Sequence, residues 1–255
     1  MLDLTRMEQA FQTYGKQFDL EDINIKRKYY HSLRVMENCK KIAEALFQTE
    51  EEKKLLVLIG YLHDIGRFKQ FSVQHSSFDN KKMDHAEYGV KVLFDENVIE
   101  DFIDTHQYDE IIKKAIFYHN KMELPSSLTK QEEIYCKAIK DADKLDLFYL
   151  ASHDPHLNNF YELPYVEGAK LSPLVKQEFD QRHLVTNSHR QTALDKLAAI
   201  LAFVYDLNFE VSKKQVTEDT INNIIDTFLT FFQVKDKEEC EYLRTSILKY
   251  KKQEN

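Results

Sequence analysis

The chain has 255 residues, of which 43% are hydrophobic, so it can bury a large core as one domain or as one domain with an extension. Its formal net charge of −8 argues against binding to duplex nucleic acid, whereas a small phosphorylated ligand needs only a local cluster of positive charge. With five glycines, four prolines and no tryptophan, the composition favours long helices over many short strands.

The cysteines and the longest apolar run indicate the cellular compartment in which the protein is expected. Cys39, Cys136 and Cys240 are far apart, which predicts neither a disulfide framework nor a thiolate zinc site. The beginning of the chain has no basic region followed by an apolar core, and the run "LLVLIGYL" is too short to span a bilayer. We therefore expect a cytoplasmic protein without a membrane segment, and its oligomeric state stays open.

Helical periodicity is strong in the first part of the chain. Apolar residues recur every three or four positions over residues 30–48, and residues 51–62 begin with acids and continue with apolar side chains. Asp84 can cap a helix, with Glu87 three residues later as in a capping box. The polar and aromatic stretch 65–82 is predicted to be a loop.

Two further stretches have helical spacing. In "YDEIIKKAIFYHNK", Ile116 and His119 share one face. In "KQEEIYCKAIKDADKLDLFYL", Asp143 occupies the apolar stripe between Ile139 and Leu147. A carboxylate in such a position needs a compensating charge.

The last hundred residues are also predicted to be helical. Residues 152–173 contain three of the prolines and are expected to form an irregular connection. Helices are predicted over 172–185, 190–208 and 217–233, before a charged stretch over 235–255. The prediction is an all-α protein with a core over residues 1–150 and a helical C-terminal portion, 151–255, packed on or next to it.

His63 and Asp64 follow the apolar run directly. On a helix they are about 100° apart, so both side chains can reach one ion beside the helix. A lone His-Asp pair is more often a surface or capping pair. Four similar residues lie on or beside other core-facing stripes, and each taken singly is more often structural: His31, His85, His119 and Asp143.

Together these six residues predict a metal centre, because a divalent cation is the natural partner of a buried carboxylate. Imidazole and carboxylate ligands suit Fe, Mn, Zn or Ni better than Ca. The predicted ligands of one ion are His31, His63, Asp64 and Asp143. His85 and His119 can hold a second ion, with Asp64 bridging the two.

This ordered series resembles the HD-domain superfamily of metal-dependent phosphohydrolases. "HSLRVMENCKKIAEAL" is similar to the family's first helix, "LIGYLHDIGR" to its signature helix and "HAEYGVKVL" to its third motif. "DADKLDLF" is similar to the final motif, whose Asp we align with Asp143 rather than Asp141. The resemblance covers about residues 25–150, and residues 151–255 carry no recognised motif.

The resemblance implies an all-α helical bundle and hydrolysis of a phosphoester by metal-activated water. The six-residue set is what the binuclear branch of the superfamily would carry, and Asp64 would be central to catalysis. Two departures narrow the activity. The acidic residues that guanosine tetraphosphate hydrolases carry after the His-Asp pair are replaced by "IGRFK", and the Gly-Tyr-Pro motif of the cyclic-dinucleotide branch is missing.

Basic residues near the signature are candidates for binding an anion. Arg67 is one turn after Asp64, where its guanidinium can clamp a phosphate or simply lie on the surface. Lys144 can touch substrate or pair with Asp141. Weaker candidates, more often part of a solvated face, are Lys26, Arg27, Lys28, Lys69, Lys81 and Lys82. Phe68, Phe71 and Phe78 can cover a nucleobase or, more often, pack the segment onto the bundle.

Three functional hypotheses follow. The first is a metal-dependent phosphohydrolase, with Asp64 and Arg67 as catalytic residues, acting on a small phosphorylated compound such as a nucleotide or phosphodiester. The second keeps the six ligands but uses two irons and molecular oxygen to cleave C–C or C–P bonds. The third is a non-catalytic metal- or nucleotide-binding module, in which Leu243, Ile247 and Tyr250 present an apolar stripe to a partner.

Overall fold

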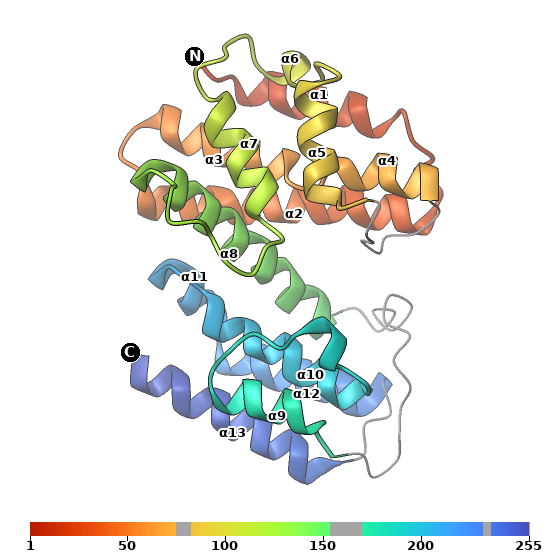
Figure 1. Cartoon of the computed structure of the whole chain (residues 1–255), viewed down its shortest axis with the longest axis vertical. Helices are drawn as coiled ribbons and strands as arrows, with labels where there is room; N and C mark the ends of the chain where they lie inside the picture. Colours follow the sequence, from red (N-terminus) through yellow and green to blue (C-terminus); the bar gives the residue numbers. More distant parts are fainter. Residues whose placement is uncertain (75–82, 154–169, 232–235, 255) are drawn as a thin grey trace. The chain divides into compact units, whose positions relative to one another are not determined.

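The structure, a computed structural model, describes residues 1–74, 83–153, 170–231 and 236–254 (Figure 1). These residues form α-helices and short 3-10 helices and contain no β-strand, which confirms the predicted all-α fold. None of the helices in the described ranges is long and apolar enough to cross a membrane.

The chain divides into two compact units, Met1–Asp143 and Lys144–Asn255. The division falls inside the long helix α8 (Lys130–His153), the same helix that contains the predicted domain boundary at residue 150. All six predicted metal ligands belong to the first unit.

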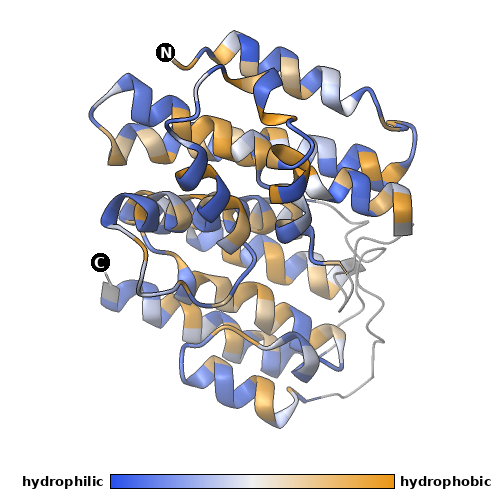
Figure 2. Cartoon of the chain, turned by 45° about the horizontal axis from the view of Figure 1, so that its top comes forward, coloured by the Kyte–Doolittle hydropathy of each residue, from blue (hydrophilic) through white to orange (hydrophobic). Residues whose placement is uncertain are grey.

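The first unit is a bundle of helices around α3. Its elements are α1 (Leu4–Gly15), α2 (Ile23–Leu46), α3 (Glu50–Leu62), α4 (Ile65–Gln74), α5 (His85–Phe94), α6 (Ile99–Phe102), α7 (Asp109–Tyr118) and the first part of α8. Helix α2 packs along α3, and α5 packs against both α4 and α7. In Figure 2 the hydrophobic residues of this unit lie mostly on helix faces that are turned toward other helices.

Helix α3 is buried because its sequence is apolar on every side after its first turn. Every residue from Leu55 to Leu62 is buried, whereas the first turn carries charge. Thr49 and Glu52 form a reciprocal capping box that sets the start of the helix. The chain therefore delivers His63, at the C-terminal end of α3, into the centre of the bundle.

Most predicted helices of this unit are confirmed, with small changes in length. The stripe over 30–48 is part of α2, and the stretch 51–62 is α3. Asp84 caps α5 by accepting from the backbone nitrogens of Ala86 and Glu87.

The predicted loop over 65–82 is wrong in its first part, because α4 begins at Ile65. The aromatic residues that resembled a loop make the apolar face of this helix. Phe68 is fully buried and its ring packs against those of Phe11, Tyr14 and Phe18. Phe68 is thus part of the core rather than a cover for a ligand. Residues 75–82, which include Phe78, Lys81 and Lys82, lie outside the described residues.

The second unit is also helical. Its complete elements are α9 (Pro173–Asp180), η2 (Asn187–His189), α10 (Ala193–Ala202), η3 (Phe203–Asp206), α11 (Glu210–Gln215), α12 (Glu218–Phe231) and α13 (Lys237–Glu254). Helix α10 is buried along its whole length, and α9, α12 and α13 pack around it. The predicted irregular connection over 152–173 falls mostly on residues 154–169, outside the described ranges.

The charged final stretch is a helix with a buried stripe. Leu243 and Ile247 on α13 are fully buried, and α13 packs against α10 and α12 within the same unit. The hypothesis that Leu243 and Ile247 bind a partner helix is therefore wrong, because both residues are already buried in the core of this unit.

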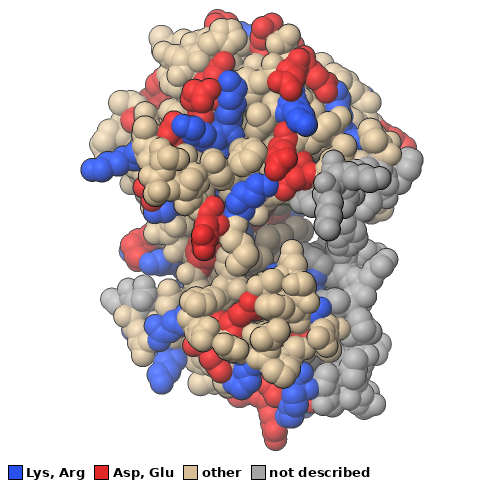
Figure 3. Space-filling model, viewed as in Figure 1, with Lys and Arg blue, Asp and Glu red and all other residues tan. Residues whose placement is uncertain are grey.

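Charges of both signs are interspersed on the molecular face drawn in Figure 3. Blue and red side chains lie next to one another on that face of each unit. Several ion pairs join residues three or four positions apart on one helix, such as Glu133 with Lys137. Neither sign covers the drawn face of a unit.

Candidate metal centre

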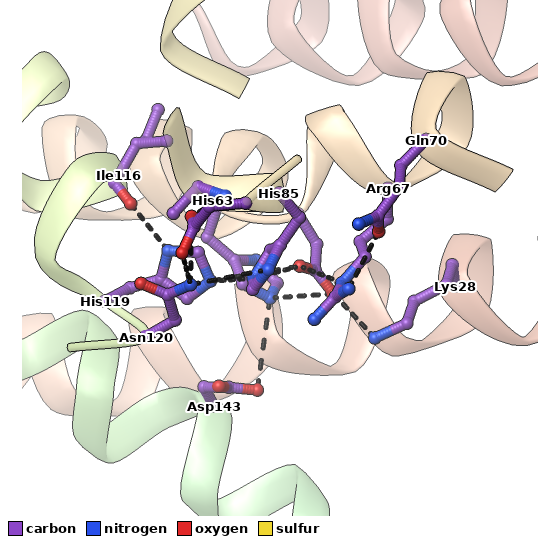
Figure 4. Close-up of polar contacts among 12 residues, drawn as sticks. Lys28, His63, Arg67, Gln70, His85, Ile116, His119, Asn120 and Asp143 are labelled. Atoms are coloured by element: carbon purple, nitrogen blue, oxygen red, sulfur yellow. Dashed lines mark hydrogen bonds and ion pairs between the residues drawn. The ribbon is translucent and has the colours of Figure 1, made fainter. Parts of the chain in front are cut away.

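Five helices of the first unit bring the six predicted ligands together (Figure 4). They are His31 on α2, His63 and Asp64 at the end of α3, His85 at the start of α5, His119 at the end of α7 and Asp143 on α8. All four imidazoles and the Asp64 carboxylate are buried. The packing of these separate helices makes the convergence.

We call His31, His63, Asp143 and Oδ2 of Asp64 the first half-site. Nε2 of His31 lies 3.2 Å from Nε2 of His63 and 3.1 Å from Oδ1 of Asp143. Oδ2 of Asp64 lies 3.5 Å from Nε2 of His31 and 3.8 Å from Nε2 of His63. His31, His63 and Asp64 thus converge as one group of donors, and Asp143 borders this group through its contact with His31.

We call His85, His119 and Oδ1 of Asp64 the second half-site. The Nε2 atoms of His85 and His119 are 2.9 Å apart. Oδ1 of Asp64 is 3.3 Å from Nε2 of His85 and 3.8 Å from Nε2 of His119. The two oxygens of a single carboxylate therefore face two different pairs of imidazoles.

Backbone carbonyls set the orientation of two of these rings. Nδ1 of His63 donates to the carbonyl of Gly60 at 2.9 Å, and Nδ1 of His119 donates to that of Ile116 at 2.6 Å. A carbonyl only accepts, so Nδ1 carries the hydrogen of the neutral ring and the lone pair of Nε2 points into the cluster. This tautomer is the one that binds a metal through Nε2.

Burial favours the neutral form of the His63 and His119 imidazoles. It lowers the pKa of His63, and it lowers the pKa of His119 to about 3 with help from the neighbouring His85 and His63. Burial alone would raise the pKa of the Asp64 carboxyl. The ammonium of Lys28 and the other positive groups around it instead hold that pKa well below its ordinary value. His63 and His119 therefore present neutral nitrogen donors beside an ionised carboxylate.

The donor set and its spacing fit divalent transition-metal ions. Two ligands at right angles, each about 2.1 Å from an ion, lie about 3 Å apart. The shortest donor separations in both half-sites are of this size. His31, His63 and Asp64 form one group of converging donors, and Asp64, His85 and His119 form another. Neutral imidazole and carboxylate donors suit Fe, Mn, Zn or Ni.

Polar residues that we did not predict support the second half-site. Nδ2 of Asn120 donates to both carboxylate oxygens of Asp84, at 3.1 and 3.0 Å, and lies 3.4 Å from Nδ1 of His85. Lys121 also donates to Asp84, at 2.7 Å. One sequence feature could have indicated these supporting residues: Asp84 and Asn120 are direct neighbours of the ligands His85 and His119.

Two cations border the cluster on the side opposite His119 and Asn120 (Figure 4). Nζ of Lys28 donates to Oδ2 of Asp64 at 2.8 Å, and Nε of Arg67 lies 3.6 Å from Oδ1 of the same residue. Nη1 of Arg67 donates to the buried Gln70 at 2.8 Å. Arg67, predicted as an anion clamp, thus lies beside the carboxylate that both half-sites share.

Other basic candidates have different partners. Lys144 forms an ion pair with Asp206 at 2.7 Å in the second unit. Lys69 pairs with Glu96. Lys26 is exposed. Among the basic residues before His31, Lys28 is bonded to a predicted ligand, Asp64.

Comparison with known families matches the HD domain to residues 29–147, a range that contains all six residues of the cluster. This match agrees with the resemblance to the HD-domain superfamily inferred from the motifs. HD domains are mostly metal-dependent phosphohydrolases, and they bind divalent metal ions. Searches among curated proteins and among solved structures give no match.

Proposed function

We propose that this protein is a metal-dependent phosphohydrolase that acts on a small phosphorylated compound, a nucleotide or a phosphodiester. One observation carries the proposal: each oxygen of Asp64 faces its own pair of imidazoles, within 3.8 Å. A carboxylate shared in this way is the bridge that a two-ion site needs. We infer two ions, bound by His31, His63, Asp64, His85, His119 and Asp143.

The charges of the cluster favour an anionic substrate. Asp64 and Asp143 carry two negative charges, and Lys28 and Arg67 carry two positive ones within contact of Asp64. With neutral imidazoles, which metal ligation requires, these four groups sum to zero. Each divalent ion then adds an uncompensated charge of two. A phosphate group, with several negative oxygens, restores the balance.

When bound, the ions would lower the pKa of a water molecule and polarise a phosphoryl oxygen. The protein's own groups orient the metal ligands and bind the substrate. Gly60 and Ile116 hold two imidazoles in the ligating tautomer through their carbonyls. Arg67, fixed by Gln70, is the proposed clamp for a phosphoryl oxygen and would stabilise charge that develops there.

The test uses protein that has been stripped of metal with a chelator and then supplied with Mn²⁺ or Fe²⁺. Hydrolysis of a chromogenic phosphomonoester or phosphodiester should appear with metal, stay absent without it, and fall at least about 100-fold in Arg67→Ala. Metal content by elemental analysis should approach two ions per chain. Wild-type protein that binds two ions and hydrolyses no phosphoester of a broad panel would contradict the proposal.

A second candidate shares the same ligands. The bridging position of Asp64 and the nitrogen-rich donor set also suit two irons that activate oxygen. Oxygen uptake by iron-loaded protein with a reductant, without phosphate release, would select this alternative. The proposal further includes a cytoplasmic location and a small phosphorylated partner rather than duplex nucleic acid, both of which follow from composition and charge.

A further inference from the structure

Lys28 holds the same carboxylate oxygen that the first half-site uses. Its Nζ is 2.8 Å from Oδ2 of Asp64, and this oxygen lies 3.5 Å from Nε2 of His31. Lys28 precedes His31 by three residues on α2, so the two side chains lie on one face of the helix. The ammonium thus serves as the counter-charge of Asp64 when no other cation is present.

The surroundings of Lys28 allow it to leave this position. Its side chain is 26% exposed, whereas that of Asp64 is 4% exposed, so the lysine reaches the buried carboxylate from the solvent side. Arg67 differs, because its side chain is 14% exposed and is also bonded to the buried Gln70. A lysine has a flexible stem and a compact charge, which suits a group that exchanges partners.

We propose that Lys28 is a substrate-binding residue that exchanges Asp64 for an anionic oxygen of the substrate. This inference rests on the proposed function and adds to it the group that recognises the anion. Lys28 is repelled from Oδ2 once Asp64 holds another cation, and its ammonium then lies within a few ångströms of any anion at the cluster. One residue therefore couples the filling of the centre to the binding of substrate.

The exchange predicts two opposite effects of Lys28→Met. Metal-free Lys28→Met should bind Mn²⁺ at least about threefold more tightly than wild type, because a competing cation has been removed. Mn²⁺-loaded Lys28→Met should bind inorganic phosphate at least about tenfold more weakly, because an ionic partner is missing. Isothermal titration calorimetry measures both constants without relying on turnover.

The controls separate charge, position and folding. Lys41→Met makes the same change at an exposed site on α2, about 20 Å along the helix, and should leave both constants unchanged. Lys28→Arg should keep most of the phosphate affinity. Lys28→Gln retains a hydrogen-bond donor for Asp64 and should fold without metal, yet it should show the same loss of phosphate binding.

The outcomes distinguish this inference from the proposed function. Phosphate binding that is equal in wild type, Lys28→Met and Lys28→Gln overturns the role of Lys28 and leaves the phosphohydrolase proposal standing. Wild-type protein that takes up two ions but binds no phosphate overturns both. Tighter Mn²⁺ binding together with weaker phosphate binding supports the exchange.

Discussion

The two half-sites share one carboxylate but are built from different parts of the bundle. The first draws on α2 and α8, which have 24 residues each, and on the end of the buried α3. The second draws on α5 and α7, which have 10 residues each. The first has a second carboxylate, Asp143, whereas the second has two imidazoles and only its share of Asp64.

The helix ends add to this difference. His63 lies at the C-terminal end of α3, where the helix dipole favours a cation. The second half-site combines His119, at the end of α7, with His85, at the N-terminal end of α5, so the two dipoles oppose one another. We infer that the first half-site holds its ion more tightly. The second, with fewer protein ligands, leaves more positions for water and substrate.

The largest effect is expected at Asp64, because both half-sites share its carboxylate. Asp64→Asn keeps the shape of the side chain but removes the charge that both half-sites share, so both ions should bind weakly. We expect metal content to fall from about two ions to well below one, and phosphoester hydrolysis to fall on the order of 10³-fold. Asp104→Asn, at a side chain that is 74% exposed, is the matched control. Two retained ions would show that Asp64 does not bridge.

His119→Ala should separate the half-sites. It removes a ligand from the second and leaves every ligand of the first, so elemental analysis should find about one ion per chain. Hydrolysis should fall roughly 100-fold, because one of two charges that stabilise the transition state is lost. Loss of both ions would show that the half-sites load together, and retention of both would exclude His119 as a ligand.

Helical periodicity explains how much of this centre was visible in the sequence. His31, His119 and Asp143 could be found because they interrupt or extend apolar stripes of α2, α7 and α8. Their division into two half-sites was predicted as well, but the distances within each half-site depend on how the helices pack together. Lys28 was only a weak candidate in the sequence, because it resembles any charged residue on a helix surface until the fold brings Asp64 to it.

Helix α4 shows a different limit. Its sequence combines Gly66 with polar residues and aromatic ones, a pattern that resembles a loop. The helix forms because tertiary contacts override local preference: Phe68 enters the core, and Gly66 allows close packing on α5. This close packing depends on how α4 and α5 are arranged in space, so it leaves no periodic pattern in the sequence.

Gly66→Ala should therefore weaken the second half-site from a distance. A Cβ at this position would lie 2.6 Å from the backbone nitrogen of Gly89 and would collide with the carbonyl oxygen of His85. We expect the free energy of unfolding to fall by about 1–3 kcal/mol. The second ion should also be lost more readily to a chelator, because the start of α5 must shift.

Urea unfolding and metal content measure these effects of Gly66→Ala. Ser72→Ala, at an exposed position of the same helix, is the control and should change stability by less than about 0.5 kcal/mol. Unchanged stability and two firmly bound ions in Gly66→Ala would show that the contact between α4 and α5 does not position His85.

The smallest effect is expected at Asn120, which follows His119 in the chain and lies beside the ring of His85. Its Nδ2 lies 3.4 Å from Nδ1 of that ring, and its Oδ1 is buried without a hydrogen-bond partner in the described part of the chain. Nδ2 also donates to both carboxylate oxygens of Asp84, the residue before His85, so Asn120 helps to position the His85 ring. Asn120→Ala should weaken the second ion about 10-fold and leave the first unchanged.

Titration of metal-free Asn120→Ala with Mn²⁺ tests this difference directly, because the two half-sites should appear as two binding steps. Asn223→Ala, at an exposed position on α12, should reproduce the wild-type curve. A change confined to the weaker step assigns that step to the second half-site, since the hydrogen bonds of Asn120 to described residues involve Asp84 and His85. A change in the tighter step would instead show that the second half-site binds its ion more tightly. That result would contradict the inference that Asp143, the additional carboxylate of the first half-site, makes binding there the stronger.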